Sequence, residues 1–114
     1  MTSSVTYSST RGCASQKHMS FREVVMRGLA HDKGLFVPDE FPVVTAEELE
    51  SWRSKSFVDL SISVISKYVG EDQVPKDILV DIVQRSCSAF RSYPDVTPVV
   101  HVNGHAILVR KLGR

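Results

Sequence analysis

Three adjacent residues near the start of the chain have side chains that can bind an anion. Ser9 and Thr10 carry hydroxyl groups, and Arg11 carries a guanidinium group that can hold a phosphate or a carboxylate through two parallel hydrogen bonds. The same guanidinium can instead pair with a carboxylate of the chain, such as that of Glu23, and fix the N-terminal segment in place. The internal pair is the simpler interpretation. Ser9, Thr10 and Arg11 are therefore the candidates for binding a substrate phosphate or for contacting another domain.

Other reactive residue types lack the spacing that catalysis or metal binding requires. His101 and His105 flank a predicted turn, but two histidines without a neighbouring carboxylate or thiol make a poor ligand set. Cys13 and Cys87 show neither metal-ligand nor redox-motif spacing, and a disulfide between them is not expected in a cytoplasmic protein. No glycine-rich phosphate loop and no Ser–His–Asp arrangement is recognisable. The sequence predicts no catalytic residue, no cofactor-binding residue and no metal ligand in this chain.

Length and composition are those of one small soluble domain. With 114 residues the chain can build a single, modest core. Its formal net charge is +1, and basic and acidic residues are interspersed, so neither a nucleic-acid footprint nor a membrane-binding patch is predicted. No apolar run approaches the roughly 20 residues of a membrane-spanning helix. The N-terminus lacks the order of a secretory signal, and the predicted location is cytoplasmic.

The segment 20–42 is expected to support the candidate residues. A helix should begin at Ser20, which forms a capping box with Glu23, and end at Gly28. A tight turn at 32–34 should then lead into the apolar segment 34–38, expected to be the most buried extended stretch. The residues expected on the apolar face of the helix are Phe21, Val24, Val25 and Leu29.

Three further helices are predicted in the middle of the chain. Thr45 with Glu48 forms a second capping box, Ser56 caps a third helix, and Pro75 suits the first turn of a fourth. The link 71–74 is short, so the third and fourth helices should pack as antiparallel neighbours and form the bulk of the core. The side chains expected to be buried are Phe57, Leu60, Val64, Ile65 and Tyr68 of the third helix, and Ile78, Leu79, Ile82, Val83, Ser86 and Phe90 of the fourth. Cys87 is expected to be a small core residue.

The C-terminal part changes from a helical to an extended pattern. Segments 96–102 and 105–109 flank Asn103-Gly104, which favours a hairpin with a type I′ turn. A short strand is also predicted at 5–9. The predicted fold class is α+β: one small domain, residues 1–114, with about four helices, short extended segments and a C-terminal β-hairpin. The hairpin residues expected to remain exposed are Val99, Val102, Ile107 and Val109.

Three motifs together resemble the N-terminal domain of threonine synthase and the threonine-synthase-like proteins. They are Ser9-Thr10-Arg11-Gly12, the helix start Ser20-Phe21-Arg22-Glu23, and Gly28 to Pro38. Two positions depart from the commonest form of the family: His31 stands where proline is frequent, and Lys33 where a second glycine is frequent. A turn of the family's shape would place Lys33 at positive φ, with modest strain.

The resemblance implies a function that the residues alone do not supply. Threonine synthase is a lyase that uses pyridoxal phosphate (PLP) to convert O-phosphohomoserine and water to threonine and phosphate. The family's cofactor lysine lies in a motif after the strand that Ile107-Leu108 match, and the segment 109–114 does not contain it. We therefore expect the catalytic domain, the phosphorylated amino-acid substrate and PLP to belong to a longer protein. The alternatives are a threonine-synthase-like phospho-lyase acting on related γ-phosphorylated substrates and a truncated, non-catalytic interaction module.

Overall fold

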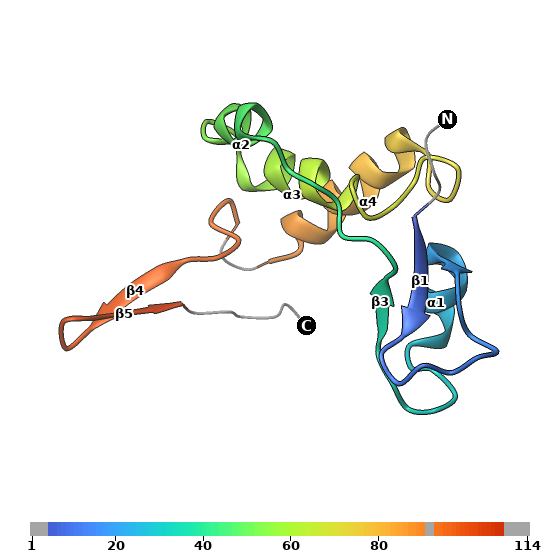
Figure 1. The fold of residues 1–114 in the computed structure, drawn as a ribbon. Coiled ribbons are helices and arrows are strands. Elements are labelled where there is room, and N and C mark those ends of the chain that lie inside the picture. The colour runs from blue at the N-terminus through green and yellow to red at the C-terminus, as the bar shows by residue number, and fades with distance from the viewer. Residues whose placement is uncertain (1–4, 91–92, 109–114) are drawn as a thin grey trace.

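The computed structural model describes residues 5–90 and 93–108, and it has the predicted α+β architecture (Figure 1). In chain order the elements are β1 (Thr6–Ser9), β2 (Met19–Ser20), α1 (Phe21–Arg27), β3 (Phe36–Pro38), α2 (Ala46–Trp52), α3 (Phe57–Ile65), α4 (Lys76–Ser88), β4 (Val99–Val102) and β5 (His105–Leu108).

Residues 5–39 form a unit that we call the N-terminal module. Its three antiparallel strands lie in the order β2-β1-β3, so the predicted strand near the N-terminus is the central one. Ser9 pairs with Phe36, and Tyr7 pairs with Pro38. Helix α1 packs against this sheet, and the rings of Tyr7 and Phe21 lie 6.1 Å apart. The sequence did not predict β2, because two residues carry too little pattern to identify a strand.

The predicted helix starts are confirmed. Ser20 with Glu23 and Thr45 with Glu48 form complete capping boxes at α1 and α2. The Ser56 side chain accepts a hydrogen bond from the Asp59 N–H at the start of α3. These side chains satisfy backbone donors that have no partner within the helix, which explains why the starts could be located from sequence.

The main hydrophobic core lies between α3 and α4, as predicted. It buries a narrower stripe of α4 than the sequence analysis expected. Its buried members are Leu79, Val83, Cys87 and Val96, and the side chains packed around them are Val58, Ile62, Val74 and Phe90. The predicted burial is wrong for Ile78, Ile82 and Ser86 of α4. It is also wrong for Phe57, Val64 and Ile65 of α3. The physical reason is that α3 covers only the 79–83–87 stripe of α4, and the neighbouring apolar stripe remains exposed.

The segment 34–38 is not the most buried extended stretch. Gly34 is buried and Phe36 is half-buried, but Leu35 and Val37 are exposed, whereas Tyr7 of β1 is buried. Successive side chains of a strand point to opposite faces, and only one face of this sheet is covered by α1. Val25 and Leu29, predicted to pack against the sheet, are exposed as well.

The chain is elongated (Figure 1), with α2, α3 and α4 between the N-terminal module and the hairpin. Its Cα radius of gyration is 16.9 Å, against about 13 Å for a compact domain of this length. The Tyr7 hydroxyl donates a hydrogen bond to the Tyr68 carbonyl and so joins the module to the segment after α3.

The C-terminal hairpin forms as predicted. Asn103 and Gly104 have φ of 49° and 79°, as a type I′ turn requires. All four residues of β4 are exposed. The expected exposure of Val99, Val102 and Ile107 is confirmed, and Val109 lies outside the described residues.

Candidate functional site

The three candidate residues converge on the turn that follows α1. The Ser9 hydroxyl donates to both carboxylate oxygens of Asp32, at 2.8 and 3.0 Å. The Thr10 N–H donates to the Leu35 carbonyl at 2.8 Å, and the Thr10 hydroxyl accepts from the Leu35 N–H at 3.1 Å. The Arg11 Nη1 donates to the Asp32 carbonyl at 3.2 Å. We call this set, residues 9–11 with 32–35, the motif corner.

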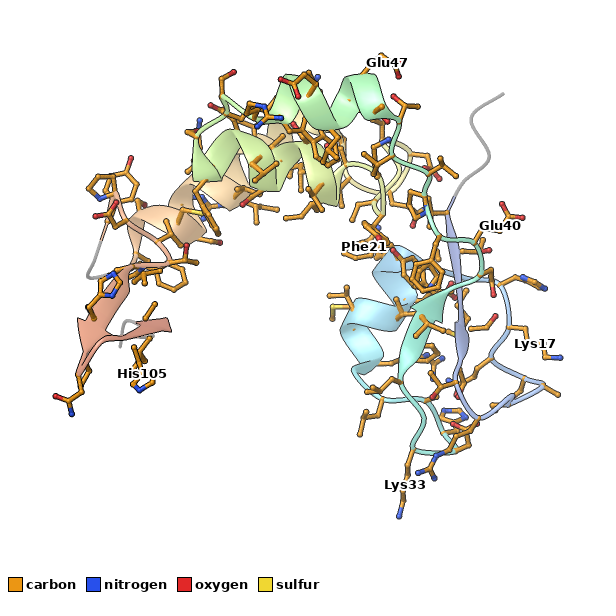
Figure 2. The ribbon with its side chains drawn as sticks, turned by 60° about the vertical axis from the view of Figure 1, so that its left-hand side comes forward. Lys17, Phe21, Lys33, Glu40, Glu47 and His105 are labelled. Carbon is orange, nitrogen blue, oxygen red and sulfur yellow. The ribbon has the colours of Figure 1, made fainter. Side chains whose placement is uncertain are left out.

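The turn within the motif corner has the shape that the sequence predicted. Lys33 has φ of 60°, the left-handed conformation that a non-glycine residue adopts at some cost, and Figure 2 shows its side chain pointing away from the sheet. The Ala30 N–H donates to the Gly34 carbonyl at 3.0 Å and closes the turn. A Cβ on Gly34 would lie 2.3 Å from the Ser9 Oγ and 2.9 Å from an Asp32 carboxylate oxygen. Only glycine therefore fits at this close approach of turn and strand.

The carboxylate of Asp32 is the central acceptor of the motif corner. Its pKa is lowered from the ordinary value, chiefly by the Gly34 N–H, with smaller contributions from the Ser9 hydroxyl, the Cys13 N–H and the positive charge of Arg11. Backbone donors, a hydroxyl and a guanidinium are the groups that bind a phosphate in other proteins. Here they surround a carboxylate of the chain itself, which stabilises the contact between β1 and the turn.

The predicted ion pair between Arg11 and Glu23 does not form. The Glu23 carboxylate accepts from the Ser20 N–H at 2.9 Å and from the Ser20 hydroxyl at 2.7 Å. Arg11 donates instead to the Asp32 carbonyl, and its side chain is otherwise exposed. Arg11 therefore contacts a backbone carbonyl of the turn instead of the expected carboxylate, and its role stays a prediction.

A second polar cluster, which the sequence did not predict, lies on the same sheet. The Asp39 carboxylate accepts from the hydroxyls of Thr6 and Ser8 and lies 3.0 Å from the His18 Nδ1. These hydroxyls and then His18 lower the pKa of Asp39. A nucleophilic triad needs the histidine between serine and carboxylate. Here both bind the same carboxylate, so the arrangement stabilises the sheet edge and activates no nucleophile.

The loop 12–18 contains a buried amide. Gln16 is 2% exposed, and its Oε1 accepts from the His31 N–H at 2.6 Å. Its Nε2 has no hydrogen-bond partner among the described residues. No signal in the residue types marks Gln16 as the anchor of this loop.

The remaining reactive side chains are dispersed. In residues 5–90 and 93–108, no three His, Cys, Asp or Glu side chains are placed to hold a metal ion. His101 and His105 are exposed on the hairpin, and Cys13 and Cys87 are both free. Over the same residues, no helix has the length and apolar character needed to cross a membrane.

The described lysines do not fit a PLP site. The Lys67 Nζ pairs with Glu48 at 2.7 Å, and the Lys55 Nζ donates to the Ser63 hydroxyl at 2.8 Å. An aldimine lysine must instead stand beside donors for the cofactor phosphate and a partner for its ring nitrogen. The other described lysines, all exposed, are Lys17, Lys33 and Lys76; Lys111 lies outside the described residues. No step of a PLP reaction is assigned to these side chains.

Comparison with known proteins gives consistent matches. The family model described as "Threonine synthase N terminus" matches residues 6–87. Threonine synthase of Schizosaccharomyces pombe is 42% identical over 87% of this chain and 19% of its own length. Human threonine synthase-like 2 is 35% identical over 75% of the chain and 17% of its own length. The chain thus spans about one fifth of the curated relatives that it matches.

Two solved structures have the same fold. The crystal structure of threonine synthase from yeast aligns with a TM-score of 0.75 at 41% identity, covering 86% of this chain and 19% of that one. The PLP-bound threonine synthase from Brucella melitensis aligns with a TM-score of 0.78 at 31% identity, covering 92% of this chain and 22% of that one. The motif corner lies within the residues that the family model matches. This chain belongs to the threonine synthase N-terminal domain family.

Proposed function

We propose that this chain serves as the N-terminal domain of a cytoplasmic threonine synthase, a PLP-dependent lyase that converts O-phospho-L-homoserine and water to L-threonine and phosphate in threonine biosynthesis. The observation that carries the proposal is the 42% identity with the fission-yeast threonine synthase over 87% of the chain. PLP and the phosphorylated amino acid bind in the catalytic domain of the longer protein, and the present chain supplies no reacting group.

Within this function, Thr10 and Arg11 contact the catalytic domain, and the buried Ser9 holds the turn beside them. Domain contact is favoured over phosphate binding because the Asp32 carboxylate already takes the Ser9 hydroxyl and lies against Arg11. A phosphate placed there would meet a like charge. Thr10 and Arg11 are exposed, so the outer surface of the motif corner is free to meet another domain.

The test is a chimera in which this chain replaces the matching N-terminal segment of the S. pombe threonine synthase. We expect PLP-dependent release of phosphate from O-phosphohomoserine, and none from the same enzyme lacking the segment. A chimera as inactive as the deletion would contradict the proposal. In the chimera, Arg11→Ala should reduce kcat/KM, whereas Lys17→Ala, which also removes an exposed cation, should not.

The isolated chain provides a second measurement. Titration with PLP followed by borohydride reduction and peptide mapping should give no stoichiometric adduct at any one lysine. An adduct at a single lysine that disappears on unfolding would show that the chain carries a cofactor site of its own.

A threonine-synthase-like phospho-lyase is the second candidate, because human threonine synthase-like 2 is 35% identical over 75% of the chain. Assays with γ-phosphorylated substrates distinguish it, since such an enzyme would release phosphate without forming threonine. A non-catalytic interaction module is the third candidate. In that case the domain should bind a partner but should not restore phosphate release in the chimera.

A further inference from the structure

The turn of the C-terminal hairpin places a reactive amide in the open. Asn103 and Gly104 connect β4 to β5, both are exposed, and Val102 and His105 form the strand pair that closes the turn. The turn lies at the tip of the hairpin, away from the N-terminal module (Figure 1). Within the described part of the chain, no hydrogen bond engages the Asn103 side chain or the Gly104 N–H. Asn103 is also the only asparagine of the sequence.

The residue after an asparagine decides whether the amide can react with the backbone. The backbone nitrogen of that residue can attack the asparagine Cγ and close a five-membered ring, and a side chain on the attacking residue hinders the approach. Gly104 has no side chain, and a Cβ built on it would meet no atom within 4 Å. Neither the attacking residue nor its surroundings therefore block ring closure at Asn103.

We propose that Asn103 is a site of spontaneous deamidation, which converts it to aspartate and isoaspartate. The Gly104 nitrogen forms a bond to the Asn103 Cγ, the bond from Cγ to Nδ2 breaks, and ammonia leaves with the proton of the Gly104 N–H. Water then opens the resulting succinimide. Cleavage at Cγ gives aspartate with a normal backbone, and cleavage at the main-chain carbonyl carbon gives isoaspartate. No oxidant, metal or cofactor takes part.

The hairpin is expected to slow this reaction only slightly. The folded turn holds Asn103 and Gly104 at φ of 49° and 79°, so ring closure requires the turn to open first. The hairpin is a separate two-stranded sheet, and all four residues of β4 are exposed. Isolated two-stranded hairpins are marginal in water, and such segments open locally without unfolding of the rest of the chain. The reactive geometry is therefore accessible from the folded protein.

The two products should affect the hairpin differently. Aspartate before glycine is still compatible with a type I′ turn. Isoaspartate adds a methylene group to the backbone between Val102 and Gly104, so the two-residue turn that sets the register of the strands is lost. Either product replaces a neutral amide with a carboxylate and changes the formal net charge from +1 to 0.

The test compares the whole chain with a synthetic peptide of residues 99–108 in the same neutral buffer. Mass spectrometry of the digested protein follows the mass gain at Asn103. The rate in the chain should lie within about tenfold of the rate in the peptide, which corresponds to an opening free energy of no more than about 1.4 kcal/mol. A rate in the chain that is lower than this limit would overturn the proposal, because the folded turn would then protect the amide.

Isoaspartate is detected separately, by methyl transfer from S-adenosylmethionine with a protein isoaspartyl methyltransferase as the probe. The aged chain should become labelled, and an equally aged Asn103→Gln variant should not, because a glutamine would have to close a less favourable six-membered ring. Equal labelling of both would place the isoaspartate at an aspartate elsewhere and contradict the proposal.

The Asn103→Asp variant is the matched control for the added charge. Amide exchange in β4 and β5 should be faster in the isoaspartate form than in this variant, whereas the urea midpoint of the two should be the same. Equal exchange would show that the longer backbone does not disturb the turn and would overturn the predicted difference between the products. These measurements use no substrate of the proposed enzyme, so they stand or fall independently of phosphate release by the chimera.

Discussion

The N-terminal module and the α3–α4 pair are held together by different interactions. In the module, two carboxylates, Asp32 and Asp39, accept hydrogen bonds that join segments distant in the sequence. In the helical pair, the contact is the apolar stripe of Leu79, Val83 and Cys87. The polar contacts fix the geometry of the module, because hydrogen bonds are directional, whereas the apolar stripe contributes free energy with little directional demand.

This difference predicts where single substitutions act. Truncating the apolar stripe should cost the most free energy of unfolding. Substitutions at the motif corner should reduce the free energy of unfolding by less. They should instead change the surface formed by the family's sequence motifs. The following predictions run from the largest expected effect to the smallest.

Leu79→Ala should reduce the free energy of unfolding by about 2–5 kcal/mol, the range for truncating a buried leucine. Leu79 is buried in the only core cluster of the described residues. The measurement is urea unfolding followed by circular dichroism. Ile82→Ala on the same helix is the control, because Ile82 is 43% exposed, and it should cost less than half as much. Equal losses would show that the two stripes of α4 are equally covered.

Gly34→Ala should cost about 1–3 kcal/mol, as expected for overpacking a tight site. The new Cβ would lie 2.3 Å from the Ser9 Oγ, on a strand that cannot easily move. Gly70→Ala is the comparison: its Cβ would lie 2.2 Å from a carboxylate oxygen of Asp72, an exposed side chain in a loop rather than a buried one on a strand. Adding Ser9→Ala to Gly34→Ala should recover part of the loss. No recovery would mean that the strain has another source.

Acid should loosen the N-terminal module before it loosens the α3–α4 contact. Hydrogen bonds lower the pKa values of Asp32 and Asp39 below the ordinary value near 3.8. A carboxyl group with a lowered folded-state pKa contributes stability that is complete above the ordinary pKa and is lost as the pH falls through the folded-state pKa. The decline should therefore fall below about pH 4.

Hydrogen exchange measured segment by segment between pH 7 and pH 2.5 checks this. After correction for intrinsic rates, β1 and the turn at 32–35 should lose protection first, and α4 last. Asp32→Asn should weaken the module at pH 7 and flatten its pH dependence, because the charged acceptor is gone. Simultaneous loss of protection in both regions would show that the N-terminal module and the α3–α4 pair do not differ in their response to acid.

Helix α1 and the turn that follows it could be predicted from the sequence because their chemistry is local. Ser20 with Glu23, Gly28 and the turn at 32–34 each act on neighbouring backbone, so residue type alone determines the structure. The strand containing Ser9 was likewise visible from its alternation. The partners of Ser9 and Arg11 could not be derived in the same way, because they depend on how β1 and β3 pair.

The errors arose where local pattern leaves two choices. Ile78, Leu79, Ile82 and Val83 form two adjacent apolar stripes, and helical periodicity does not say which one α3 covers. The Asp39 cluster contains His18 at φ of 52°, and it depends on the pairing of segments distant in the sequence. The buried Gln16 accepts from the His31 N–H, a tertiary contact without a sequence signal.

The smallest effect should come from the hairpin turn, and it sharpens the contrast between coupled and isolated regions. Gly104 and Gly12 have nearly the same φ, 79° and 76°, and a Cβ at either would meet no atom within 4 Å. Alanine at either position therefore carries a similar local strain, roughly 1–2 kcal/mol for an L-residue in the left-handed region.

The two sites differ in what surrounds them. Gly12 lies in the module, where its N–H donates to the Ser9 carbonyl at 3.1 Å, so Gly12→Ala should lower the urea midpoint. The hairpin around Gly104 is a two-stranded sheet with an exposed β4, and such hairpins are marginal in water. Gly104→Ala should thus leave the midpoint unchanged and speed amide exchange only in β4 and β5. If it lowers the midpoint as much as Gly12→Ala does, the hairpin folds cooperatively with the rest of the chain.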